Sequence, residues 1–387
     1  MRILICPMAA MGKMSGPINR TKALAEAFTK KGNQVALCAA KDGNFDGTTD
    51  YPLYDLETPV PLGLPKMMGK RLLPVVEKTG IQSHKKISSF EEVQFISGNI
   101  QPGYFKRAIH QIQAAIEDFR PDVVYSEFNL AAIAAAKLAG TAVFGSYSRP
   151  AQVDFAASPG LAYGVKRVLK SLGLPQVDSS LDILEWVDRR IVPSSPRLEP
   201  IIGDNVCFTG PFSAHQTHYE DGLRSTIVAY MGTGTLSGKA LVNALYPVFS
   251  ELDFEVFIVA PGVKESHRGF IHIGEYFDFS EIYPRCCLSI NHGGQNSIMD
   301  ALYHGIPQIL CPGKVFERRY NAQSIAKNKA GIVLDTHCFE PPYIRGIMRT
   351  LLENKGYAKN AQILGKELTV LGGADRVVQL AVEYFGG

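Results

Sequence analysis

A long hydrophobic segment is missing from this chain of 387 residues. A membrane-spanning helix needs about 20 consecutive apolar residues, and no stretch approaches that length. The opening run Met1–Ala10 is short, has only Arg2 as a basic flank and leads into a glycine-containing turn. A signal peptide needs a longer apolar core and a cleavage site, so we expect a first strand here and a soluble protein.

A cysteine framework and a strong net charge are missing as well. The seven cysteines are scattered, and no Cys or His pair has zinc-finger spacing. Cys286 and Cys287 are neighbours that would point to opposite faces of a strand, so we expect a buried strand there and not a disulfide. A net charge of +3 is small for this length. These absences favour a cytoplasmic protein and argue against a nucleic-acid partner.

What the chain does contain is the composition of a folded protein. Hydrophobic residues make up 46% and charged residues 20%, which is the balance of globular domains. A chain of this length is too long for one ordinary core and suits two domains of roughly 200 residues each.

Strand-like apolar runs and amphipathic helical segments alternate along the chain. We expect strands over 3–6, 34–39, 122–126, 142–146, 190–193, 225–231 and 255–260, and helices over 19–31, 104–119, 130–138 and 237–250. Two such series, separated by a polar segment, predict an α/β protein with two Rossmann-like, doubly wound lobes that face a cleft. The predicted domains are 1–212 and 224–387, joined by a linker over 213–223.

A glycine turn near residue 293 is the most informative local feature. A buried strand over 288–290 is followed by His292, Gly293 and Gly294, and then by a helix to about residue 304 that Asn296 or Ser297 would cap. The first turn of a helix offers unpaired N–H groups and a positive dipole end, which suit a phosphate. Many α/β proteins contain such a turn, so the local pattern also leaves a purely structural role open.

The longer segment from 273 to 334 resembles the donor-binding signature of family 1 glycosyltransferases. The matching residues are His292-Gly293-Gly294, Asn296-Ser297, Asp300, Gly305-Ile306-Pro307, Pro312, Glu317, Asn321-Ala322 and Gly331. Three further stretches, GPINRTKALAEAF, VCFTGPF and MGTGTLS, are similar to the family's first-lobe motif, its Gly-Pro strand end and its turn over the donor phosphates. The resemblance implies the GT-B fold, with a last helix over 375–384 that crosses back to the first lobe.

The resemblance also implies roles for residues of the second lobe. His292 would contact the phosphate nearer the nucleoside, and Asn296 with Ser297 the phosphate nearer the sugar. Asp300 would bind ribose hydroxyls. Tyr276 would stack on the base, with a core aromatic residue as the alternative interpretation. The glycine-rich turn over the diphosphate would consist of Gly232, Thr233 and Gly234.

The sugar-binding positions show one departure from the family. Glu317 matches the acidic residue that binds sugar hydroxyls, but the next residue, usually Gln, is Arg318 here. Arg318 would suit a donor sugar with another hydroxyl pattern or a negative group. The alternative is a solvated arginine at the start of a helix.

The usual catalytic base is also absent. The family's first-lobe histidine aligns with Pro17, within an acceptor-binding stretch formed by Ser15, Gly16 and Pro17. Arg20 is cationic at neutral pH and does not suit a base. The best substitute is Glu127, at the carboxyl end of a strand, because burial can raise the pKa of a carboxyl. The alternative is a helix-entry carboxylate before 130–138.

The resemblance implies an inverting transfer from a UDP- or TDP-sugar to a hydroxyl of a small, hydrophobic acceptor such as a polyketide, macrolide or lipid. The chain has no Asp-x-Asp motif, so we expect neither a metal nor a cofactor besides the nucleotide sugar. An epimerase of similar shape and a sugar-nucleotide-binding auxiliary protein are the alternatives. The irregular stretch 51–86 is expected to cover a binding cleft, to contact a membrane surface or to pack on its own lobe.

Overall fold

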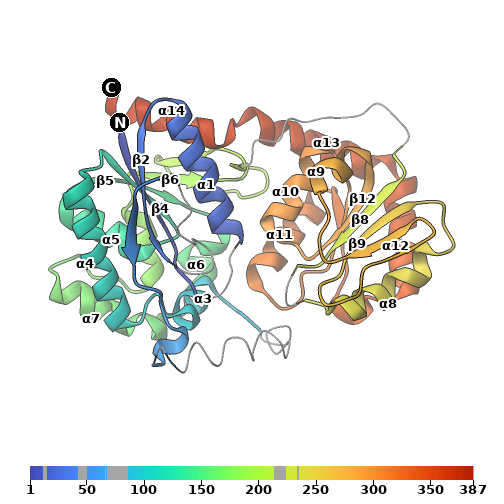
Figure 1. Cartoon of the computed structure of the whole chain (residues 1–387), viewed down its shortest axis with the longest axis horizontal. Helices are drawn as coiled ribbons and strands as arrows, with labels where there is room; N and C mark the ends of the chain where they lie inside the picture. Colours follow the sequence, from blue (N-terminus) through green and yellow to red (C-terminus); the bar gives the residue numbers. More distant parts are fainter. Residues whose placement is uncertain are drawn as a thin grey trace. The chain divides into compact units, whose positions relative to one another are not determined.

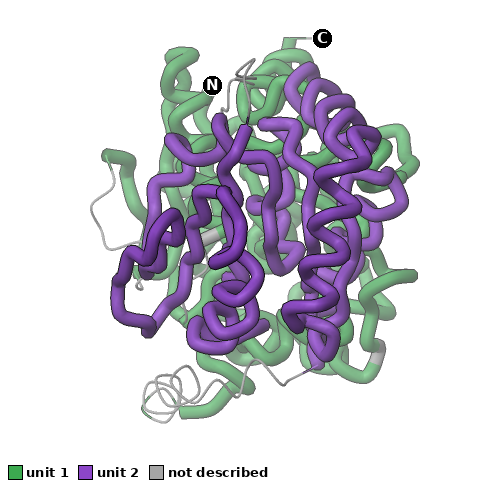
Figure 2. The backbone as a smooth tube through the Cα atoms, turned by 90° about the vertical axis from the view of Figure 1, so that its right-hand side faces the viewer, with its two compact units in different colours: residues 1–75, 88–214, 371–387 green, residues 76–87, 215–370 purple. Residues whose placement is uncertain are grey.

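The structure is a computed structural model, and it describes residues 1–11, 15–41, 50–65, 67, 86–212, 224–232 and 235–386. The chain forms two compact units, coloured separately in Figure 2. Unit 1 contains residues 1–75, 88–214 and 371–387, and unit 2 contains residues 76–87 and 215–370. The predicted linker over 213–223 lies outside the described residues.

Unit 1 is built on a seven-stranded parallel sheet. Its strands are β1 (Arg2–Pro7), β2 (Gln34–Ala40), β3 (Leu53–Leu56), β4 (Val123–Glu127), β5 (Ala142–Ser146), β6 (Arg189–Val192) and β7 (Val206–Phe208). The spatial order β3-β2-β1-β4-β5-β6-β7 reverses direction between β1 and β4. Ligands of such sheets collect at the carboxyl ends of the strands where the order reverses.

Helices cover both faces of this sheet (Figure 1). On one face lie α1 (Ser15–Lys30) and α14 (Gly373–Gly386), and on the other lie α4 (Pro102–Phe119) and α5 (Leu130–Ala139). Unit 1 also contains α3 (Phe90–Ser97), α6 (Val153–Ala156) and α7 (Tyr163–Ser171). Helix α1 starts earlier than predicted and takes Pro17 into its first turn, where a missing N–H costs little.

The last helix belongs to unit 1, although the chain reaches it from unit 2. The apolar stripe of α14, which includes Val377 and Ala381, is buried in the same core as Leu24 of α1 and Ile3 of β1. Unit 2 therefore ends at residue 370, and the last helix packs its apolar side on the first unit, as the resemblance implies.

Unit 2 repeats the architecture with a second seven-stranded sheet. Its strands are β8 (Thr226–Tyr230), β9 (Glu255–Val259), β10 (Ser266–Arg268), β11 (Ile271–Gly274), β12 (Cys286–Asn291), β13 (Gln308–Leu310) and β14 (Gly331–Val333). Their order is β10-β11-β9-β8-β12-β13-β14; β10 pairs antiparallel with β11, and the other neighbours pair in parallel. Here the order reverses between β8 and β12.

The two faces of this sheet carry different helices. Ile227 and Ala229 of β8 join a core with α8 (Gly238–Phe249) and α12 (Pro341–Glu353), whereas Val228 joins a core with α9 (Phe279–Ile282) and α10 (Gln295–Tyr303). This alternation follows from the period of two in a strand. Helices α11 (Phe316–Lys327) and α13 (Lys355–Val370) complete the unit. The predicted α/β fold with two doubly wound lobes is confirmed.

The stretch 51–86 is more regular at its start than the sequence predicts. It opens with β3, which adds to the edge of the unit 1 sheet, and continues with a 3₁₀ turn at Pro61–Gly63. Residues 66 and 68–85, which carry most of the predicted membrane-contact side chains, lie outside the described residues. None of the helices that the structure describes has the length and apolar character to span a bilayer.

Candidate functional site

The glycine turn after β12 is held in place from three sides. The Asn291 side chain accepts a hydrogen bond from the Gly293 N–H at 2.9 Å, and Asn321 Nδ2 donates to the Gly293 carbonyl at 3.2 Å. Gly293 has φ +79°, and a Cβ there would lie 2.7 Å from the backbone oxygen of Arg318. The turn needs glycine because the first turn of α11 packs directly on it. The family signature includes Asn321, but the sequence does not reveal its hydrogen bond with Gly293.

His292 is the central side chain of this turn. It is 8% exposed, and its buried Nδ1 has no hydrogen-bond partner among the residues that the structure describes. Burial, followed by the nearby charge of Arg318, lowers the pKa of His292 to about 3. The imidazole is therefore neutral at pH 7. The Nε2 edge of the ring faces the two glycines, because a Cβ on Gly294 would lie 2.5 Å and a Cβ on Gly232 2.9 Å from His292 Nε2.

Helix α10 begins two residues earlier than an Asn296 cap would require. Its N-cap is Gly294, which has no side chain, and no side-chain hydrogen bond caps the helix. The predicted capping by Asn296 or Ser297 is therefore wrong: both lie in the first turn, Asn296 exposed and Ser297 buried. The first N–H groups and the positive dipole end of α10 thus lie next to His292, which is a favourable place for an anion.

The loop after β8 meets this turn at the reversal point of the sheet. Gly232 has φ +57°, and a Cβ there would lie 2.8 Å from His292 Cε1. Further along the loop, Thr235 Oγ1 accepts a hydrogen bond from Arg318 Nη1 at 2.9 Å. Thr233 and Gly234 lie outside the described residues. Gly232 and His292 are therefore brought together, as two parts of one site would require.

The sequence leaves two interpretations open for Arg318 and two for Tyr276, and the structure excludes one of each. Arg318 is half-buried, donates to Thr235 and has a pKa lowered by burial, so it is not a solvated surface arginine. Tyr276 is 81% exposed, so it is not a core aromatic residue. Asp300 is partly buried on α10, and Glu317 is exposed in the first turn of α11.

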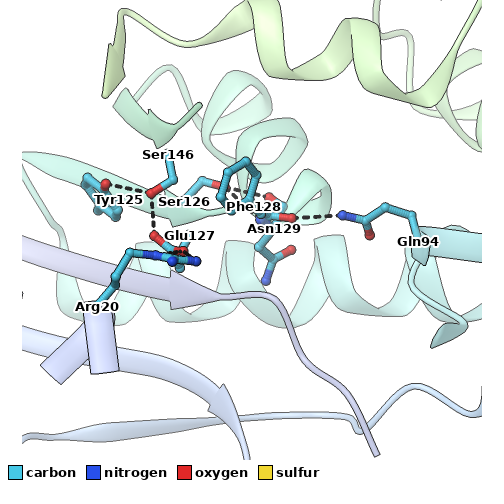
Figure 3. Close-up of polar contacts among 8 residues, drawn as sticks. All are labelled: Arg20, Gln94, Tyr125, Ser126, Glu127, Phe128, Asn129 and Ser146. Carbon is cyan, nitrogen blue, oxygen red and sulfur yellow. Dashed lines mark hydrogen bonds and ion pairs between the residues drawn. The ribbon is translucent and has the colours of Figure 1, made fainter. Parts of the chain in front are cut away.

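A second polar cluster lies in unit 1, at the carboxyl end of β4 (Figure 3). Glu127 is fully buried, and Arg20 Nε and Nη2 both lie 2.7 Å from its Oε1. Ser146 donates a hydrogen bond to Oε2 of Glu127, and Tyr125 is bonded to Ser146 at 2.8 Å. We call Arg20, Tyr125, Glu127 and Ser146 the β4 cluster. Both carboxylate oxygens of Glu127 are occupied by protein donors.

The backbone after Glu127 turns sharply. Phe128 has φ +55°, and its carbonyl accepts from Gln94 Nε2 at 3.1 Å (Figure 3). Asn129 caps α5, accepting from the Ala132 N–H at 3.2 Å. The interpretation of Glu127 as a helix-entry carboxylate is therefore wrong, because Asn129 performs that role and Glu127 is the last residue of the strand.

The predicted acceptor-binding residues lie in the first turn of α1. Gly16 and Pro17 are partly buried, and the side chain of Ser15 lies outside the described residues. A Cβ on Gly16 would lie 3.7 Å from Arg20 Nη1. The N–H of Met8, just after β1, donates to the Glu127 carbonyl at 2.9 Å. The β4 cluster thus lies where the strand order of unit 1 reverses, and sequence reasoning missed Ser146 and the pairing role of Arg20.

Two doubly wound units with polar residues at both reversal points define the fold. Solved structures of GT-B glycosyltransferases share this fold along the whole chain. A calicheamicin glycosyltransferase has a TM-score of 0.75 at 13% identity, with 100% of this chain and 98% of that one covered. A spinosyn rhamnosyltransferase complexed with thymidine diphosphate has a TM-score of 0.70 at 17% identity, with 98% and 100% covered.

Sequence comparisons find similar proteins for part of the chain. Residues 249–383 match the family described as erythromycin biosynthesis protein CIII-like, C-terminal domain. The aclacinomycin-T 2-deoxy-L-fucose transferase of Streptomyces galilaeus is 26% identical over 136 residues, 34% of this chain and 30% of the relative. The chain matches only part of its curated relatives: 30% of the length of this transferase, and 52% and 16% of the lengths of two others. The predicted resemblance to macrolide-type, family 1 glycosyltransferases of the GT-B fold is confirmed.

Proposed function

We propose that this protein is a glycosyltransferase that transfers a sugar from a nucleotide diphosphate to a hydroxyl of a small acceptor. The observation that carries the proposal is the buried, neutral His292 packed against Gly232 and Gly294, beside the uncapped start of α10. Such a site offers N–H donors and a dipole to a diphosphate. The transferases named above support the assignment, and the thymidine diphosphate of the spinosyn enzyme supports a pyrimidine nucleotide donor.

In this proposal, the site stabilises the diphosphate as it leaves. Negative charge develops on the leaving oxygen, and preorganised donors at the start of α10 bind that charge without reorganising. Arg318, held by Thr235 at 2.9 Å, adds a fixed positive charge close enough to lower the pKa of His292. We infer that this cation and the helix dipole together perform the charge neutralisation for which other enzymes use a divalent metal.

The remaining donor contacts follow the family's pattern. Asp300 would bind the ribose, and exposed Tyr276 is available to stack on the base. Glu317 would bind sugar hydroxyls. Gly232, with Thr233 and Gly234, would close over the diphosphate. The proposed donor is a UDP- or TDP-sugar.

The proposed acceptor is a small, hydrophobic molecule that binds near Gly16 and Pro17. An inverting displacement needs a base for the acceptor hydroxyl, and Glu127 is the predicted one. A base must come within about 2.6–3.2 Å of the proton that it removes, whereas both oxygens of Glu127 accept from Arg20 and Ser146. The proposal therefore requires Glu127 to exchange one of these partners for the acceptor.

The donor site is tested by binding. We expect UDP- or TDP-sugars to raise the apparent melting temperature of the wild type, since a ligand of the native state adds RT ln(1 + [L]/Kd) to its stability. His292→Ala and Ser297→Ala should each weaken binding at least about tenfold. The matched control is His337→Ala, which alters an exposed histidine of the same unit. Equal affinity in all four proteins would show that nucleotide sugars bind elsewhere.

One observation favours a second candidate function. Pro17 cannot accept a proton and Glu127 is enclosed by an ion pair, which suits a sugar-nucleotide-binding auxiliary protein without turnover of its own. Release of nucleoside diphosphate that depends on an added acceptor would support the transferase. Tight donor binding with no product across a panel of polyketide, macrolide and lipid acceptors would support the auxiliary protein.

A further inference from the structure

Two histidines converge on the β10–β11 hairpin, at the edge of the unit 2 sheet. His267 and His272 are direct register partners on the antiparallel strands, so their side chains lie on the same face. Their Nδ1 atoms are 2.8 Å apart, and the ring planes are inclined at 72°. We call His267 and His272 the hairpin histidine pair. Strands β11 and β9 separate this edge from the reversal point at β8.

The second nitrogen of each ring faces a carboxylate. His272 Nε2 lies 3.5 Å from Glu255 Oε1, and His267 Nε2 lies 4.0 Å from Glu265 Oε1. Both carboxylates lie beyond the usual hydrogen-bond distance from Nε2, and they add negative charge beside the two rings. The two Nδ1 atoms are within hydrogen-bond distance, so in the metal-free protein one ring donates its N–H to the other, and a bound cation would take the place of that proton. The pair is thus arranged to share one positively charged ligand.

The spacing of the two nitrogens fits a metal ion. Imidazole nitrogens bind such ions at about 2.0–2.1 Å. Two nitrogens at that distance are about 2.9 Å apart when the angle at the metal is a right angle, and about 3.3 Å apart when it is tetrahedral. The observed 2.8 Å is close to the right-angle value. Right-angle nitrogen ligands are typical of Cu²⁺ and Ni²⁺.

We propose that His267 and His272 bind a divalent transition metal ion through their Nδ1 atoms, with Cu²⁺ preferred over Ni²⁺ and Zn²⁺. Among the residues that the structure describes, no group of three or more His, Cys, Asp or Glu side chains is arranged around a metal position. The protein therefore supplies two ligands, and water supplies the others. The order of metals follows the general stability series for nitrogen ligands.

The surroundings keep the pair in place and open to solvent. His272 is stacked on Phe257 with ring centroids 4.6 Å apart, so its orientation is set by packing. Arg285 Nη1 lies 3.1 Å from Glu255 Oε2 and holds that carboxylate beside the ring. His267 is exposed, so an ion reaches the site from solvent. The site is independent of the donor site and of the proposed transferase activity.

Titration with Cu²⁺, followed by calorimetry and electron paramagnetic resonance, tests this inference on the full chain. We expect one equivalent to bind, with a spectrum of two imidazole nitrogens. His267→Gln and His272→Gln should each weaken binding at least about tenfold. Glu265→Gln should weaken it less, since it removes only the group behind the ring.

His110→Gln is the matched control, because His110 is an exposed histidine on α4 whose Nδ1 lies 3.2 Å from the side-chain oxygen of Gln113. It should bind Cu²⁺ as the wild type does. The substituted histidines lie at a sheet edge, and unchanged circular dichroism would show that the variants are folded. A double variant, His267→Gln with His272→Gln, that binds an equivalent as tightly as the wild type would overturn the inference, as would a wild type that binds none.

Discussion

At the scale of single residues, the donor site depends on a glycine and a histidine that tertiary packing places together. Gly293 is required twice, by its positive φ and by the backbone of Arg318 beside its Cα. His292 is neutral because it is buried and lies near Arg318. A hydrogen-bond donor that carries no charge costs less to bury than an imidazolium.

Gly293→Ala tests the contact with α11. A left-handed alanine costs about 1–2 kcal/mol of unfolding free energy, and the clash with the Arg318 carbonyl should add an overpacking cost of about 1–3 kcal/mol. Gly262→Ala is the matched control, because Gly262 has φ +75° but a Cβ there would meet no atom within 4 Å. Denaturant unfolding should show a larger loss for Gly293→Ala, together with loss of nucleotide binding. Equal losses would contradict the packing argument.

The pKa of His292 predicts a dependence of stability on pH. The folded pKa is about 3, below the unfolded value of about 6.5. The unfolded state therefore takes up the proton first, and stability falls as the pH drops below about 6.5. Between about pH 7 and pH 5 this single group should cost about 2 kcal/mol. His292→Asn should show a shallower loss over that range in urea unfolding curves, and parallel curves would refute the assignment.

At the scale of elements, the carboxyl ends of β4 and β5 carry polar groups of unit 1. The β4 cluster joins two strands and a helix: Glu127 from β4, Ser146 from β5 and Arg20 from α1. An ion pair this deeply buried is sensitive to loss of either partner, because the remaining charge has no water around it. The same cluster carries the predicted catalytic group.

Glu127→Gln separates a base from a structural ion pair. Loss of the charge should lower the free energy of unfolding by about 3 kcal/mol, since it leaves Arg20 buried beside a neutral amide. Glu353→Gln, which breaks an exposed ion pair with Arg349 on α12, should leave the free energy of unfolding nearly unchanged. If Glu127 is the base, turnover of the folded variant should also fall at least about 100-fold.

The double variant Arg20→Met with Glu127→Leu completes this test. Replacing a buried ion pair by apolar residues of similar volume is often neutral for stability. We expect the double variant to be more stable than Glu127→Gln and still inactive. Turnover that recovers together with stability would remove Glu127 from the mechanism and leave it the role of holding Arg20.

At the scale of the whole molecule, the last helix shows that the division into units does not follow the order of the chain. The buried side of α14 contributes Val377 to the unit 1 core, while Val382 on the same helix is 55% exposed. Unit 1 is thus completed by the carboxyl-terminal residues, after the chain has formed unit 2.

Val377→Asp should destabilise unit 1 by about 3 kcal/mol or more, because it buries an unpaired charge. Val382→Asp is the control and should change stability by less than about 0.5 kcal/mol. In calorimetry, Val377→Asp should lower one transition, and a nucleotide sugar should raise the other, which belongs to unit 2. If the nucleotide sugar raised only the melting temperature of the unit 1 transition, which is the one that Val377→Asp lowers, the placement of the donor site in unit 2 would be contradicted.

The sequence by itself determined the alternation of strands and helices, the two doubly wound units and the glycine turn before α10. These features follow from local periodicity and from residues close together in the chain, such as His292, Gly293 and Gly294. The sequence left the start of α10 uncertain, because a glycine cap leaves no side-chain signal.

Only the tertiary structure decided which polar groups meet and how they ionise. Glu127 and Arg20 are 107 positions apart, and Arg318 and Thr235 are 83 apart, so no local pattern predicts either contact. The low pKa of His292 comes from the removal of water by surrounding elements, which is a property of packing. The hairpin histidine pair is close in sequence, but its shared face and 2.8 Å spacing depend on the register of β10 with β11.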